Sequence, residues 1–121
     1  MKHCSALVLL LVGALALVGC RTIPENASVA EYCKTGEAYT NLKDVPFEQG
    51  LAMTKKLAAV GTPAGIDASA RAGFVELINR MEDSRDAADF RRRTDTMGKA
   101  EEKHLLALYT YNQKICSQPV G

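Results

Sequence analysis

The chain has 121 residues, with 15 lysines and arginines against 14 aspartates and glutamates, and 47% of its residues are hydrophobic. This length allows a single domain. The near-neutral charge argues against a nucleic-acid partner, because such proteins carry a basic patch or a strongly basic domain.

The first twenty residues have the layout of a secretory signal. Lys2 is followed by an unbroken run of small and apolar residues from Ser5 to Val18, and Gly19 and Cys20 precede the first polar cluster. The run is about 15 residues long, whereas about 20 are needed to cross a hydrocarbon core. We therefore expect export and cleavage rather than a permanent transmembrane helix.

Leu17, Val18, Gly19 and Cys20 resemble the lipobox of bacterial lipoproteins at all four positions. The resemblance implies that a signal peptide of residues 1–19 is removed and that the Cys20 thiol carries a diacylglyceryl group. It also implies a mature protein on the extracytoplasmic face of the cell membrane, held stably by its acyl chains. The alternative is an ordinary signal peptide with a cysteine at the cut by chance.

The mature chain is expected to begin with a short tether, residues 20–25, followed by a helical domain over 26–121. Asn26 or Ser28 can cap a first helix that ends by 42–44. Its predicted inward face carries Val29, Tyr32, Cys33 and Gly36.

A second helix is predicted to start with Pro46 as its first residue and to stop at Gly61. The stretch 61–65 holds two glycines and a proline, which predicts a loop. A third helix restarts at Asp67 or Ser69. The inward stripes of these helices are Phe47, Leu51, Thr54, Leu57 and Ala58, then Ala70, Phe74, Leu77, Ile78 and Met81.

The segment 83–97 is highly charged, and Asp86 can cap a short helical piece there, although a mobile connector is the alternative. A last helix is predicted over 99–117, with Leu105, Leu108, Tyr109, Asn112, Ile115 and Cys116 on one face. No stretch alternates as a strand does. The predicted fold is therefore all-α, a three- to four-helix antiparallel bundle.

Given the lipobox, Cys4 leaves with the signal and Cys20 carries lipid, so Cys33 and Cys116 are the only pair left in the mature fold. Both lie on predicted inward faces, and an exported protein meets an oxidising compartment. We therefore predict a disulfide between the first and last helices. The alternatives are a reactive free thiol, a metal pair or an intermolecular bridge.

The mature chain offers little chemistry. Its one histidine, His104, has no patterned nucleophile or orienting partner, so we expect a solvated helix residue and no enzyme. No ligand cluster predicts a metal or another cofactor. Arg91, Arg92 and Arg93 form the only basic cluster and are a candidate contact surface, although flanking aspartates favour a solvated segment.

A second resemblance covers most of the mature chain. Tyr32-Cys33, the run 60–64 (Val-Gly-Thr-Pro-Ala), the run 66–74 and the late Cys116 look like small secreted or lipid-anchored helical proteins common in actinobacteria. The resemblance implies a compartment and a helical fold. It implies no activity.

The leading functional hypothesis is a non-enzymatic, lipid-anchored module that contacts an unknown envelope protein through loop 61–67 or the segment 84–97. The second hypothesis is a carrier or sensor of a small ligand or lipid. Its apolar pocket would be lined by Phe47, Phe74, Leu77, Met81 and Tyr109. The third hypothesis is a phage- or prophage-encoded lipoprotein that blocks superinfection.

Overall fold

The computed structural model describes residues 22–40 and 45–117. Five helices follow in chain order: α1 (Val29–Thr40), α2 (Phe47–Val60), α3 (Ala68–Asp83), α4 (Ala87–Asp95) and α5 (Lys99–Cys116). Within these ranges no strand forms, and one isolated bridge joins Ala27 to Pro63. The predicted all-α class is confirmed. The described residues hold one helix more than the largest number expected, because the segment after Asp86 is helical.

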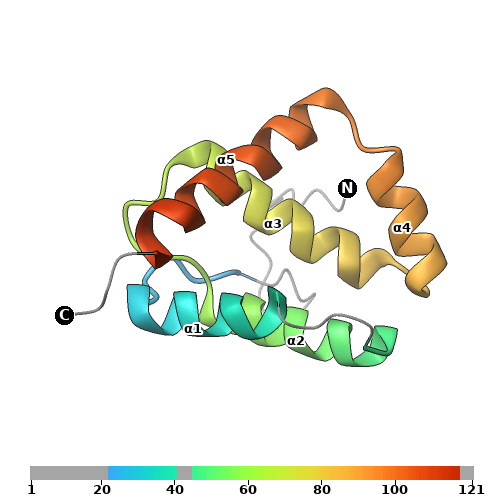
Figure 1. Ribbon diagram of the computed structural model, residues 1–121, viewed down its shortest axis with the longest axis horizontal. Helices are drawn as coiled ribbons and strands as arrows, with labels where there is room; N and C mark the ends of the chain where they lie inside the picture. The colour runs from blue at the N-terminus through green and yellow to red at the C-terminus, as the bar shows by residue number, and fades with distance from the viewer. Residues whose placement is uncertain (1–21, 41–44, 118–121) are drawn as a thin grey trace, which may run out of the picture.

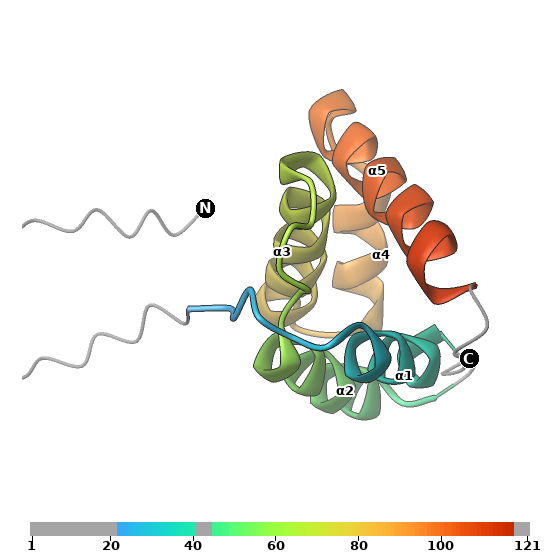
Figure 2. The ribbon, with the colours of Figure 1, turned by 90° about the vertical axis from the view of Figure 1, so that its left-hand side faces the viewer.

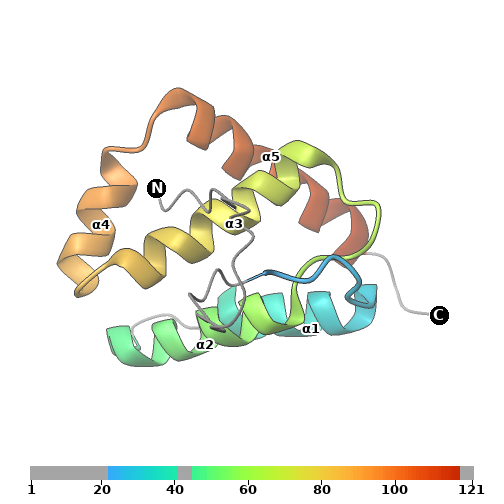
Figure 3. The ribbon, with the colours of Figure 1, turned by 180° about the vertical axis from the view of Figure 1, so that it is seen from behind.

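The helices pack as two layers. α1 and α2 lie side by side in one layer, and α3 and α5 form the other. α4 connects α3 to α5 at one end of the molecule (Figures 1 and 2). Seen from behind, the segment before α1 crosses the side formed by α2 and α3 (Figure 3). The core between the layers contains Ile23, Tyr32, Leu57, Ala58, Phe74, Ile78 and Leu108.

Most helix boundaries follow the capping residues that the sequence predicts. The Ser28 hydroxyl accepts a hydrogen bond from the backbone N–H of Glu31 at 3.1 Å, and the Asp67 carboxylate accepts one from Ala70 at 2.8 Å. Each side chain satisfies a backbone donor that the first helical turn leaves unpaired. Pro46 is the N-cap of α2 rather than its first residue. The predicted end of the first helix, at 42–44, lies outside the described residues.

The predicted boundary between tether and domain, at residue 26, is too late. Ile23 is only 8% exposed and belongs to the core. The backbone N–H of Thr62 donates to the Pro24 carbonyl at 3.0 Å, and that of Ala27 donates to the Thr62 carbonyl at 3.1 Å. Apolar burial at Ile23 and these backbone pairings therefore bring residues 22–27 into the folded domain.

The last helix is less buried than its sequence pattern indicates. Leu108 is the one residue of α5 that is buried. Cys116 is exposed, and Tyr109 is 63% exposed. For Tyr109 the reason is geometric, because α5 leads away from α1 before its C-terminal end (Figure 1). Cys116 is exposed although the disulfide holds that end of α5 beside α1. The expected buried position of Cys116 is therefore wrong, although its pairing is right.

Candidate functional site

An apolar groove of about 590 Å³ lies between α1 and α5 and is the candidate functional site. Leu57, Phe74 and Leu77 from α2 and α3 lie at its base, and Tyr109 belongs to its α5 wall. This volume falls in the range typical of small-molecule pockets, about 300 to 1,000 Å³. We call it the α1–α5 groove.

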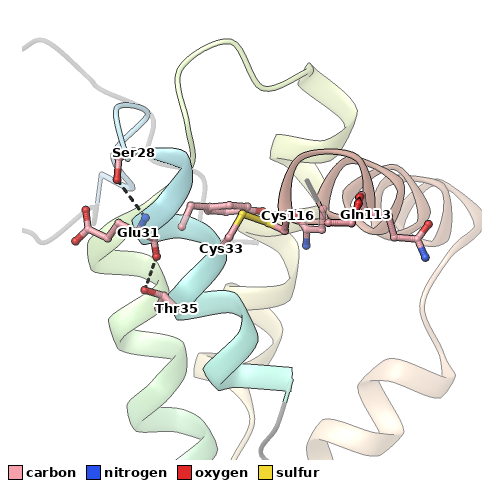
Figure 4. Close-up of a disulfide and its surroundings, with 9 residues drawn as sticks. Ser28, Glu31, Cys33, Thr35, Gln113 and Cys116 are labelled. Atoms are coloured by element: carbon pink, nitrogen blue, oxygen red, sulfur yellow. Dashed lines mark hydrogen bonds between the residues drawn. A yellow bond between two sulfur atoms is a disulfide. The ribbon is translucent and has the colours of Figure 1, made fainter. Parts of the chain in front are cut away.

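A disulfide joins the two walls of the α1–α5 groove. Cys33 of α1 and Cys116 of α5 are bonded, with their Cα atoms 5.4 Å apart (Figure 4). The predicted pairing is confirmed. The disulfide holds the C-terminal end of α5 close to α1. Toward its N-terminal end, α5 lies progressively farther from α1 (Figure 1).

Contacts with α3 hold the other side of α5. Gly73 allows the approach, since a Cβ atom there would lie 2.3 Å from the carbonyl oxygen of His104. Arg80 donates to Glu101 at 2.9 Å, and His104 Nδ1 lies 2.9 Å from Glu76 Oε1. The expectation of a solvated His104 is wrong, because Glu76 holds the half-buried imidazole between the helices.

Tyrosines supply the polar groups at the base of the α1–α5 groove. The Tyr32 hydroxyl donates to Asn112 Oδ1 at 2.6 Å. Burial, followed by the nearby Tyr111, raises the pKa of Tyr32 to about 12 despite that hydrogen bond. Burial also raises the pKa of Tyr39. Both phenols are therefore neutral at physiological pH and can orient a bound group without adding charge.

The structure brings together part of the pocket predicted from the sequence. Phe74, Leu77 and Tyr109 line the groove, but Phe47 and Met81 do not. Met81 instead packs toward α2, where its terminal methyl would lie 2.9 Å from a Cβ atom at Gly50. Periodicity identified inward faces, but it could not show that α1 supplies one groove wall, because that depends on how the helices cross.

The candidate basic surface, Arg91 to Arg93, lies on α4, where a buried carboxylate pairs with two of its three arginines. Arg92 and Arg93 both pair with Asp89, which is 4% exposed, and Arg85 lies 3.6 Å from it. Arg91 is exposed and forms no side-chain ion pair with another residue in the described ranges. Two of the three arginines thus stabilise the start of α4 and are not free for an outside partner.

Replacing Asp89 with asparagine is expected to lower the midpoint temperature of unfolding at neutral pH. It should also make that midpoint less dependent on pH below about pH 4. The backbone N–H of Arg85, then Arg92 and Arg93, hold the pKa of Asp89 below its ordinary value of 3.8. Its ionised form therefore stabilises the fold above about pH 4, and this contribution is lost as the pH falls further. Thermal unfolding of both proteins between about pH 2 and 7 measures the effect.

Asp95→Asn is the matched control for that experiment, because Asp95 is an exposed residue of the same helix. It should keep the neutral-pH midpoint of the parent. Equal acid dependence in the parent and in Asp89→Asn would contradict the role of Asp89.

No protein-family model matches the chain, and neither the curated proteins nor the solved structures contain a significant match. In the described part of the chain, no helix combines the length and apolarity needed to span a membrane. The same residues contain no group of three or more histidine, cysteine, aspartate or glutamate side chains placed to hold a metal ion.

Proposed function

We propose that the protein is a non-enzymatic binding module, anchored at the extracytoplasmic face of a bacterial membrane through acylated Cys20, and that the α1–α5 groove is its binding site. The lipobox supports the anchor, and the Cys33–Cys116 disulfide suits an oxidising compartment. The observation that carries the binding role is an open apolar groove with Tyr109, 63% exposed, on its wall.

The groove replaces the contact surfaces first expected from the sequence. Gly61, Thr62 and Pro63 are buried beneath the N-terminal segment, so three of the seven residues of loop 61–67 have little surface to offer. α4 uses Arg92 and Arg93 internally. The partner we propose is an envelope protein that inserts apolar side chains between α1 and α5, because exposed aromatic residues beside apolar pockets are typical of binding anchors.

A small apolar ligand is the second candidate occupant. The groove volume of about 590 Å³ favours it, because that space suits one small molecule. The neutral Tyr32 and Asn112 pair would then provide one polar contact on a mostly apolar surface, which Lys34, Glu37 and Tyr39 also line.

Filling the groove with Gly36→Leu is expected to abolish partner capture while leaving the fold intact. Gly36 lines the groove, and a Cβ atom there meets nothing within 4 Å. The added side chain should therefore occupy space meant for the partner. In-cell crosslinking of the full chain, followed by mass spectrometry, measures capture. An apolar dye titrated into the purified protein measures ligand binding.

Ala38→Leu provides the matched control, since Ala38 is exposed on the same helix and does not line the groove. It should capture the same envelope protein as the parent. Capture that survives in Gly36→Leu would contradict the groove as the protein-binding site. Loss of dye binding alone would favour the small-ligand alternative.

A further inference from the structure

The segment that leads from Cys20 into the domain is part of the domain itself. Ile23 is buried in the core, and Pro24 pairs with Thr62 through a backbone hydrogen bond of 3.0 Å. Gly61 makes the contact possible, since a Cβ atom there would lie 2.1 Å from the Pro24 carbonyl oxygen. We call residues 22–27 the mount.

Arg71 of α3 clamps the mount from the other side. Its guanidinium donates to the Ile23 carbonyl at 2.6 Å and to the Pro24 carbonyl at 3.0 Å, and its Nε lies 3.2 Å from Glu25. It also donates to the Thr62 hydroxyl at 2.8 Å. A planar guanidinium with several donors in use restrains both the position and the direction of the segment it binds.

Covalent length then limits how far the domain can stand from an anchored Cys20. Two residue steps separate Cys20 from Thr22, and an extended chain covers at most about 3.6 Å per residue. The Cα atoms of these residues are therefore within about 7 Å of each other. A lipid on Cys20 would bring Thr22 and the side of α3 beside it to the level of the lipid headgroups.

The α1–α5 groove opens on a different side of the molecule. Arg71 and Val75 of α3 lie beside Thr22 at the start of the mount, whereas Leu77 of the same helix lines the groove. Val75 and Leu77 project from α3 about 200° apart around the helix axis. Figures 2 and 3 also show the mount and the groove on different sides of the molecule. The mount runs along the side formed by α2 and α3, and α1 and α5 form the other side.

We propose that the mount holds the Arg71–Val75 side of α3 against the phospholipid surface and turns the α1–α5 groove away from it. This inference rests on the proposed acylation of Cys20. It deepens the proposed function, because a groove turned away from the bilayer receives its occupant from the extracytoplasmic space. A segment of an envelope protein fits that direction of approach better than a lipid drawn from the anchoring membrane.

The chain contains no tryptophan, so a single introduced Trp reports its own distance from a membrane. Asn79→Trp places it at an exposed site one turn beyond Val75, and Tyr109→Trp places it at the groove. The protein beginning at Cys20 retains every described residue, and its one free thiol can be coupled to a maleimide lipid because Cys33 and Cys116 are bonded. Phosphatidylcholine vesicles with a headgroup nitroxide lipid then quench whichever Trp lies near the surface.

Trp at 79 is expected to be quenched at least about twofold more than Trp at 109. The two sites lie on neighbouring helices, α3 and α5, whose axes pack roughly 8 to 10 Å apart, and residue 79 projects from α3 about 200° away from the groove residue Leu77. A ten-residue Gly/Ser spacer between Arg21 and Thr22 should remove the difference without touching the fold. Arg71→Met should reduce it by releasing the clamp. Equal quenching at both sites in the unspaced protein, or stronger quenching at 109, would overturn the proposal.

A separate measurement keeps this inference distinct from the proposed function. The mass of the N-terminal peptide of the protein purified from producing cells shows whether Cys20 carries a diacylglyceryl group. Its absence would refute the proposed anchor, while the vesicle experiment still decides whether the mount orients the domain.

Discussion

Replacing Cys33 and Cys116 together with serine is expected to lower the free energy of unfolding by about 4 kcal/mol. The bridge joins residues separated by 83 positions. Closing a loop of that size in the unfolded chain is worth about 4.5 kcal/mol in the chain-entropy model, and measured losses fall between about 2 and 5 kcal/mol. Small domains have total stabilities of about 5 to 15 kcal/mol, so the reduced protein should be marginal.

Urea denaturation of the protein lacking residues 1–19 checks this expectation. Cys20→Ser should be present in both proteins, so that no free thiol can exchange with the bridge. Adding reductant to the parent provides the control, because it should reproduce the loss without any change of sequence. A loss below about 1 kcal/mol would show that contacts between α3 and α5 alone hold the last helix in place.

Gly61→Ala is expected to cost about 3 kcal/mol or more. Gly61 has φ of 78° and ψ of −154°, a backbone region that only glycine adopts readily. In addition, the new Cβ atom would lie 2.1 Å from the Pro24 carbonyl oxygen, so the mount must move. Backbone strain alone accounts for about 1 to 3 kcal/mol, and displacement of the mount adds the loss of Ile23 burial.

Gly65→Ala separates these two contributions. Gly65 has φ of 80°, but a Cβ atom there meets nothing within 4 Å, so only the backbone conformation is penalised. We expect a loss of about 1 kcal/mol in the same denaturation experiment. Hydrogen exchange should show faster exchange over 22–27 in Gly61→Ala and not in Gly65→Ala. Equal losses in the two variants would contradict tight packing of the mount on Gly61.

Several local features of the fold were predictable because they depend on residues close together in the chain. Gly61 ends α2 as predicted, and the structure selects Asp67 over Ser69 as the start of α3 and a helix over a connector after Asp86. Caps work through hydrogen bonds and backbone angles within one helical turn. The disulfide was also predicted, because the lipobox resemblance left only one pair of cysteines for the mature domain.

The mount could not be predicted from the sequence. Residues 20–25 look like a polar linker, and nothing local signals that Ile23 is buried or that Arg71 binds its carbonyl. Arg71 lies 48 positions away, so the contact exists only once α3 has packed. In the same way, His104 acquires Glu76 as a partner only because Gly73 lets α3 and α5 approach each other.

The all-α class, most helix ends and the cysteine pairing could be inferred from the amino-acid sequence, which also supplies the lipobox on which the proposed anchor rests. Each of these depends on short-range patterns or on elimination among a few residues. The position of the groove, the arginines that are engaged in ion pairs and the start of the domain became known from the three-dimensional fold. These features depend on the angle at which helices cross, and that angle follows from the packing of many side chains that are distant in the chain.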